Sequence, residues 1–195
     1  MAGTGKQDAN LAAGESAQAE RDWVARTRAG DTAAFAHLVE RYSSRVYGHL
    51  FRLVRNRDEA EDLAQETFLR AFRFLGQYDE ARPFRNWLYR IAMNAAFNAL
   101  RTRRRRGYAA PVDVEEIPAG NPGLGNTGQE ELRARLDAAL ARLPRRVALL
   151  IALHYEEGMT VREAAAVVNM SEGAAKVALC RARKALRRWL IEDEE

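Results

Sequence analysis

Residues 160–190, TVREAAAVVNMSEGAAKVALCRARKALRRWL, indicate the type of fold more clearly than any other part of the chain. Thr160 and Glu163 form a capping-box pattern, which predicts the start of a short helix. Asn169 tolerates the left-handed backbone of a tight turn, and Ser171 is suited to cap a second, longer helix. Two helices joined in this way predict a helix-turn-helix, whose second helix enters the major groove of DNA.

The second of these helices has two contrasting faces. Its small and apolar positions, expected to face inward, are Ala175, Leu179, Ala182, Leu186 and Leu190. Its outward positions are Glu172, Lys176, Val177, Cys180, Arg181 and Lys184. A helical hairpin with a merely solvated basic face is the alternative, but the caps, the small residues and the basic face together favour DNA binding.

The remaining sequence also has helical periodicity. Asp31 is placed to cap one helix, and Asp58 with Glu61 forms a capping-box pattern for the next. Pro83 and Pro144 suit the first turns of two later helices. No stretch alternates as a strand does, so we predict an all-α fold. The helices that begin near Asp58, Pro83 and Pro144 are expected over about 58–75, 84–102 and 144–157.

Composition and charge divide the chain into two helical domains. Among its 31 basic residues only Lys6, Lys176 and Lys184 are lysines, and an excess of arginine favours a nucleic-acid partner. Residues 111–130 hold four acids, no basic residue and no apolar periodicity, which predicts a flexible acidic linker. The expected divisions are a disordered extension over 1–20, domains over 21–108 and 131–191, a linker over 109–130, and an acidic tail over 192–195.

Several classes of protein are excluded by what the sequence lacks. The single cysteine, Cys180, rules out internal disulfides and multi-cysteine zinc sites. No apolar run has membrane-spanning length, and residues 1–20 lack a secretion pattern, so we expect a cytoplasmic protein without membrane insertion. No phosphate loop, nucleophile–base pair or metal-ligand spacing occurs, so we expect neither an enzyme nor a cofactor.

Five arginines are crowded into six positions at the end of one expected helix. They are Arg101, Arg103, Arg104, Arg105 and Arg106. Cations complement the negative end of a helix dipole, which explains part of the pattern. A run this dense repels itself unless an anion is near, so phosphate contact is the favoured interpretation.

Aromatic, amide and basic side chains precede the arginine run. They are Phe84, Trp87, Tyr89, Arg90, Asn94 and Asn98. This combination suits unstacked bases, which are bound by stacking and by hydrogen bonds to their edges. For Trp87 alone, a place in the core is the favoured interpretation.

One helix face in this basic domain is acidic. Asp62, Gln65 and Glu66, with Leu69 beside them, lie opposite the expected buried stripe. Such a face is poorly suited to phosphate and well suited to a basic protein partner. A solvated helix face is the alternative.

Two runs carry a family resemblance: DEAEDLAQETF at 58–68 and FRNWLYRIAMN at 84–94. They resemble region 2 of the sigma-70 family. Together with the helix-turn-helix, their order and spacing resemble regions 2 and 4 of its extracytoplasmic-function (ECF, group 4) branch, over about 21–108 and 130–190. The resemblance implies a sigma factor that binds core RNA polymerase, directs it to promoters and opens the minus-ten element, without being catalytic itself.

The resemblance also implies roles for individual residues. The surface docking on the clamp helices of the β′ subunit would be Asp62, Gln65, Glu66 and Leu69. The minus-ten element would be read and opened, with a base flipped into a pocket, by Tyr78, Arg82, Phe84, Trp87, Arg90, Asn94, Arg101, Arg103 and Arg104. The minus-thirty-five element would be bound by Ser171, Glu172, Gly173, Lys176, Arg181 and Lys184.

Further partners and a location follow from the same resemblance. The implied partners are the β flap of the polymerase and an anti-sigma protein that covers both domains. The implied location is the nucleoid within the cytoplasm, and the implied role is in a response to stress. The serious alternative is a self-sufficient regulator that binds an operator as a dimer and has no need of the acidic face. A protein-interaction module would leave the arginine run and the helix-turn-helix unexplained.

Overall fold

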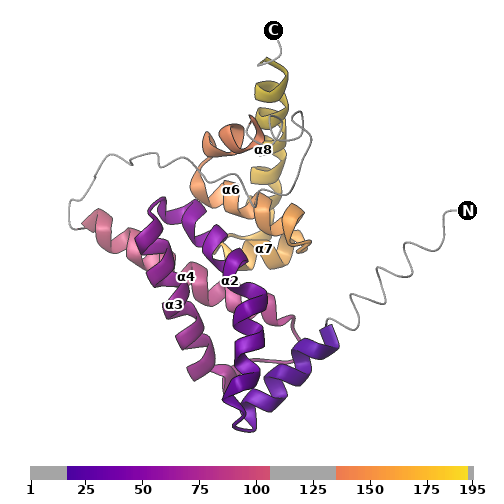
Figure 1. Ribbon diagram of the computed structural model, residues 1–195. Coiled ribbons are helices and arrows are strands. Elements are labelled where there is room, and N and C mark those ends of the chain that lie inside the picture. Colours follow the sequence, from indigo (N-terminus) through magenta and orange to yellow (C-terminus); the bar gives the residue numbers. More distant parts are fainter. Residues whose placement is uncertain (1–16, 106–134, 193–195) are drawn as a thin grey trace, which may run out of the picture.

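We describe residues 17–105 and 135–192 of a computed structural model, and all the regular elements in these ranges are helical. They form an N-terminal helical group (17–105) and a C-terminal helical group (135–192), which pack against each other (Figure 1). The all-α prediction and its two helical domains are confirmed. The expectations for residues 1–16, for the linker over 109–130, for Arg106 and for residues 193–195 lie outside the described residues.

The N-terminal helical group is built around a long central helix. Residues 17–28 are helical, and they are followed by α2 (Thr32–Val54), α3 (Arg57–Arg73), the 3-10 helix η1 (Leu75–Gln77) and α4 (Phe84–Arg105). Helices α2, α3 and α4 contact one another pairwise. Phe35, Leu38, Tyr42, Val46 and Leu50, spaced three and four residues apart, are all buried, as the helical periodicity predicts. Burying each such side chain contributes about 1.5–3 kcal/mol to folding.

The ends of α2 show where short-range sequence rules succeed and where they fail. Asp31 caps α2 as predicted, because its carboxylate accepts a hydrogen bond from the Ala34 N–H. The predicted capping box of Asp58 and Glu61 is wrong, because α3 begins earlier. Its cap is Asn56, whose side-chain oxygen accepts from the Glu59 N–H at 2.8 Å.

The physical reason for this difference is the turn between the two helices. Arg55 adopts a left-handed conformation with φ 57°, which ends α2, and Asn56 is then extended. Its short side chain is therefore placed over the first turn of α3. Asp58 lies inside that first turn, where its carboxylate complements the positive end of the helix.

The chain start differs from expectation in one respect. Residues 17–20, assigned above to a disordered extension, are helical. The Tyr42 hydroxyl donates a hydrogen bond to the Glu20 carboxylate, and Val24 is buried in the core. These contacts attach this first helix to α2.

The C-terminal helical group contains the predicted helix-turn-helix. Residues 135–141 are helical, followed by α6 (Arg145–Ile151), the π-helical turn η2 (Ala152–Glu156), α7 (Val161–Val167) and α8 (Glu172–Glu192). The capping box of Thr160 and Glu163 is confirmed, as are the left-handed turn at Asn169 (φ 54°) and the Ser171 cap. Ala175, Leu179 and Ala182 are buried as predicted.

The leucines at the start of this group are only partly buried. Leu136 is 40% exposed, and the buried position in its helix is Ala139. Leu140 and Leu143 are half-buried against the core. Among the described residues, no helix is both long enough and apolar enough to cross a membrane.

Candidate nucleic-acid and protein interfaces

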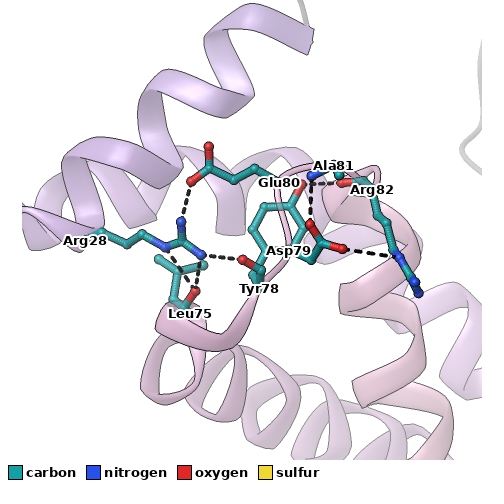
Figure 2. A network of polar contacts seen from close by, with 7 residues as sticks. All are labelled: Arg28, Leu75, Tyr78, Asp79, Glu80, Ala81 and Arg82. Carbon is teal, nitrogen blue, oxygen red and sulfur yellow. Dashed lines mark hydrogen bonds and ion pairs between the residues drawn. The ribbon is translucent and has the colours of Figure 1, made fainter.

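The loop between η1 and α4 is held in place by an arginine from the first helix. Figure 2 shows the Arg28 guanidinium donating to the Leu75 carbonyl at 2.9 and 3.1 Å and to the Tyr78 carbonyl, while also pairing with the Glu80 carboxylate. Arg28 is not among the predicted site residues, since it lies 47 positions from Leu75 and belongs to no motif. The loop backbone is thus fixed from outside its own segment.

Contacts within the loop complete this network. The Asp79 carboxylate accepts from the Ala81 N–H at 3.0 Å and pairs with Arg82 at 3.4 Å (Figure 2). The Tyr78 hydroxyl donates to the Arg82 carbonyl. Burial raises the pKa of Tyr78 to about 12, so this hydroxyl keeps its proton at neutral pH.

The predicted minus-ten residues fall into two sets. Phe84 is fully buried and Tyr78 only 7% exposed, and their rings lie 5.3 Å apart, so both support the loop from within. Trp87 is half-buried, 5.4 Å from Tyr78, and packs against the core as favoured above. Arg82 and Arg90 are exposed. The candidate contacts to a base are therefore the half-buried Trp87 and the exposed Arg82 and Arg90, not the buried Tyr78 and Phe84.

A cavity of about 580 Å³ adjoins the loop. Trp87, Arg90 and Arg82 line it from the N-terminal helical group, while Arg162 and Glu163 line it from α7. A cavity of this size is in the range that holds a small organic ligand. Helix α7 covers one side of it, because the Asn86 side-chain amide donates to the Glu163 carboxylate at 2.7 Å.

The later part of α4 carries the remaining minus-ten candidates. Arg101 and Arg104 are exposed, whereas Arg103 is half-buried and pairs with Glu59 at 3.3 Å. Asn94 is exposed and accepts a hydrogen bond from the Asn169 side chain at 3.2 Å. Arg101 and Arg104 are thus the cations available to phosphate, and Arg103 also ties α4 to α3.

The predicted protein-docking face lies on the exposed side of α3. Asp62, Gln65 and Leu69 are exposed, and Leu69, at 69%, is the most exposed large apolar residue in the described chain. Glu66 pairs with Arg70 one turn on. Sequence analysis missed that Phe72 and Phe74 are also exposed nearby on the chain. Acidic and apolar groups side by side suit a protein partner better than DNA.

The predicted minus-thirty-five residues share the outer face of α8. Glu172, Gly173, Lys176, Arg181 and Lys184 are all exposed. The hydrogen bond from Lys176, 2.6 Å long, lowers the pKa of the Glu172 carboxyl. Apart from its chain neighbours and the backbone of its own helix, no atom lies within 4 Å of where a Cβ would stand on Gly173, so another molecule can approach closely there. The Ser171 hydroxyl caps the helix.

The two helical groups meet through polar contacts that join α2 to the end of η2. His49 and Glu157, 2% and 8% exposed, lie 3.3 Å apart, and Arg52 forms a bidentate pair with Glu156 at 2.8 and 2.9 Å. Burial alone would raise the pKa of Glu157, but the hydrogen bond from His49 and the nearby Arg45 charge act against burial, and the net effect lowers that pKa. The described residues contain no cluster of three or more His, Cys, Asp or Glu placed to hold a metal ion.

These features are those of a helix-turn-helix protein that also carries an acidic and apolar exposed face on α3. A family model described as Sigma-70 region 2 matches residues 38–106, and one described as Sigma-70, region 4 matches residues 133–186. The chain belongs to the sigma-70 family of RNA polymerase sigma factors, in the ECF subfamily.

Curated relatives extend over nearly the whole chain. The RNA polymerase sigma-H factor of Pseudomonas aeruginosa is 32% identical, over 86% of this chain and 91% of its own length. The ECF RNA polymerase sigma factor SigW of Bacillus subtilis is 31% identical, over 86% and 94%. Among solved structures, CnrH in complex with the cytosolic domain of CnrY is similar with a TM-score of 0.60 and 28% identity, over 90% of this chain and 99% of that one.

Proposed function

We propose that this ECF sigma factor binds core RNA polymerase through α3, places it at promoters through α8, and opens the minus-ten element with the loop before α4. The observation that carries the proposal is the separation of three chemically different surfaces on one small chain. One surface is acidic and apolar, one combines a cavity with aromatic and basic groups, and one is a helix-turn-helix. A sigma factor acts as an initiation subunit and is not itself an enzyme.

The polymerase-binding surface is Asp62, Gln65, Glu66 and Leu69, and its partner is the clamp helices of β′. Its carboxylates attract a basic surface and set the orientation of docking. The exposed Leu69 side chain supplies apolar area that is buried on binding. The β flap is the proposed contact of the C-terminal helical group.

The minus-ten surface combines base capture with backbone contact. Arg82, Trp87, Arg90 and Asn94 contact the opened strand, and a flipped base enters the cavity beside Trp87. Contacts inside the cavity offset the free energy of unstacking that base. Tyr78 and Phe84 hold the loop. Arg101 and Arg104 neutralise phosphates directly, and Arg103 does so once it leaves its pair with Glu59.

The minus-thirty-five surface is the beginning and outer face of α8. Its contacts are Ser171, Glu172, Gly173, Lys176, Arg181 and Lys184. Side chains early in a recognition helix reach base edges, and later basic groups reach phosphates. Lys176 leaves its pair with Glu172 when it binds DNA.

Promoter binding requires the two helical groups to move apart. Promoter elements about two turns apart are separated by about 70 Å, at ~35 Å per turn. A linker over 109–130 reaches about 70 Å at ~3.3 Å per residue when extended. We place the two domains at 21–108 and 131–191, with this acidic linker lying extended in a basic channel of the polymerase. An anti-sigma protein would hold the domains inactive in the cytoplasm, away from the nucleoid.

Run-off transcription with purified core polymerase and a randomised promoter library tests the proposal. Wild-type protein is expected to start transcription, and the Asp62→Ala/Glu66→Arg variant is expected to fail through lost docking on the polymerase. Glu40→Arg is the matched control, because Glu40 is an exposed acid on α2, outside the docking face. Equal initiation by the double variant and wild type would contradict the assignment of α3.

A further inference from the structure

A second groove, of about 530 Å³, lies where the two helical groups meet, away from the loop cavity. Arg101 and Arg104 line it from α4, and Arg145 and Arg146 line it from α6. None of the described residues that line it is acidic. Within 17–105 and 135–192, none of these four arginines has a carboxylate partner. The groove therefore concentrates positive charge that the described protein does not neutralise.

Contacts around the groove hold two of these guanidinium groups in place. Arg145 donates to the Leu53 carbonyl at 2.8 Å, and Arg146 lies over the Phe97 ring at 4.7 Å. Burial, together with the nearby Arg103 and Arg55 guanidiniums, lowers the pKa of Arg145, while Glu59 opposes this effect. Cations held together against their repulsion form a prearranged anion site, because a bound anion relieves that repulsion.

The size and donors of the groove narrow the ligand class. Its volume exceeds what one phosphate needs, and the four guanidiniums come from two helices, so an anion with several phosphates in a chain would fit it. Asn94 and Asn169, hydrogen-bonded to each other at 3.2 Å, add amide donors from the two helical groups. Neither Arg145 nor Arg146 belongs to the proposed promoter-binding surfaces.

We propose that this groove binds an oligophosphate anion, inorganic or carried by a nucleoside, and that the anion joins the two helical groups. The inference goes beyond the proposed function, because it concerns the packed form of the free protein rather than the promoter complex. Asn94, Arg101 and Arg104 are shared with the proposed minus-ten surface, so oligophosphate and promoter DNA exclude each other. A ligand of the packed form also raises its thermal stability.

Titration calorimetry on the full chain tests the proposal, with inorganic tripolyphosphate and ATP as probes and orthophosphate at equal ionic strength as reference. We expect tripolyphosphate to bind and to raise the Tm, and orthophosphate to do neither. Affinity for ATP equal to or above that for tripolyphosphate identifies a nucleoside ligand, and weaker affinity identifies an inorganic one. Equal binding of all three anions would overturn the proposal, since it would indicate general charge screening.

A variant and a matched control locate the site. Arg146→Gln is expected to raise the Kd for tripolyphosphate about tenfold, the loss of one charge-assisted contact. Arg146 is exposed, so the fold should tolerate this change, and an unaltered Tm without ligand verifies it. Arg142→Gln is the control, because Arg142 also lies over an aromatic ring, that of Trp189 at 5.6 Å, but outside the groove.

Two outcomes would contradict the location or the ligand. Equal affinity of the Arg146→Gln and Arg142→Gln variants for tripolyphosphate would place the anion elsewhere. If Arg146→Gln weakens promoter DNA binding while tripolyphosphate does not bind wild type, the groove is part of the DNA surface. Transcription by wild type in the run-off assay would stand in either case, so the two proposals fail independently.

Discussion

The two candidate DNA surfaces differ in how freely they can be reached. The outer face of α8 is exposed along its length, and α8 projects away from the N-terminal helical group (Figure 1). The loop cavity is instead covered on one side by α7, and Asn94 is hydrogen-bonded to Asn169 across the junction of the two groups. In this arrangement the proposed minus-thirty-five surface is open to a partner, whereas the proposed minus-ten surface is partly covered by the C-terminal helical group.

The two surfaces also differ in whether the predicted residues can contact DNA themselves or only support those that do. On α8 the predicted side chains themselves face solvent. Around the loop, Tyr78 and Phe84 are inside, and Arg28 holds the backbone from another helix. A substitution of one of these exposed α8 side chains should therefore affect DNA binding alone, while one around the loop affects stability and binding together.

The largest effect is expected for Phe84→Ala. Removing a fully buried aromatic ring leaves a cavity, and such changes cost about 3–5 kcal/mol of unfolding free energy. Urea denaturation followed by circular dichroism measures this loss. Arg90→Ala, an exposed change nearby, should leave stability intact and weaken promoter opening; equal stability of the two variants would place Phe84 outside the core.

The next effect is expected for Arg28→Gln. Lost hydrogen bonds to the Leu75 and Tyr78 carbonyls should cost about 1–3 kcal/mol. The loop should loosen, so promoter opening, followed by permanganate reactivity of unpaired thymines, should fall. Binding to a duplex with only the minus-thirty-five element should not change. An equal loss in both assays would mean that Arg28 acts on the whole fold rather than on the loop. Arg26→Gln, which removes an exposed pair with Asp31, is the control.

A smaller effect is expected from acid at the junction of the two groups. In the folded protein the pKa of Glu157 is lower than its ordinary value of 4.5, which applies to the unfolded chain. The ionised carboxylate therefore stabilises the folded, packed form at every pH above 4.5. That contribution is lost as the pH falls through the still lower folded pKa. Between pH 7 and pH 3, the free energy of unfolding should therefore fall more for wild type than for Glu157→Gln. Parallel profiles of the two proteins would rule out this carboxylate as the cause.

The smallest effect is expected for Cys180→Ser. The thiol is exposed on α8, and surface changes of this kind usually alter stability by no more than about 0.5 kcal/mol. Promoter binding measured with and without hydrogen peroxide should match wild type. An oxidant response that disappears in the variant would instead assign a sensing role to the thiol.

Much of the local structure was predictable because its causes lie within a few residues. The Asp31 cap, the Thr160–Glu163 box and the left-handed turn at Asn169 all form as expected. The start of α3 was mispredicted, because both Asn56 and Asp58 are acceptable caps. Choosing between them depends on where Arg55 ends the preceding helix.

The residues of each candidate site could be chosen from the sequence, but whether each side chain is buried or exposed could not always be predicted. The exposed side of α3 and the outer face of α8 follow from helical periodicity and charge. The inward position of Phe84 did not follow, since an aromatic residue at a helix start suits either a core or a base-stacking site. Packing against Tyr42 and Tyr78 decides between them.

The sequence by itself determined the helices, most of their caps, the family and the chemical character of each surface, because these depend on neighbouring residues and their periodicity. Tertiary structure alone decided the pairing of His49 with Glu157, 108 positions apart, the hold of Arg28 on the loop, and the groove between α4 and α6. Such contacts depend on how whole helices pack, and packing brings together side chains that no spacing along the chain connects.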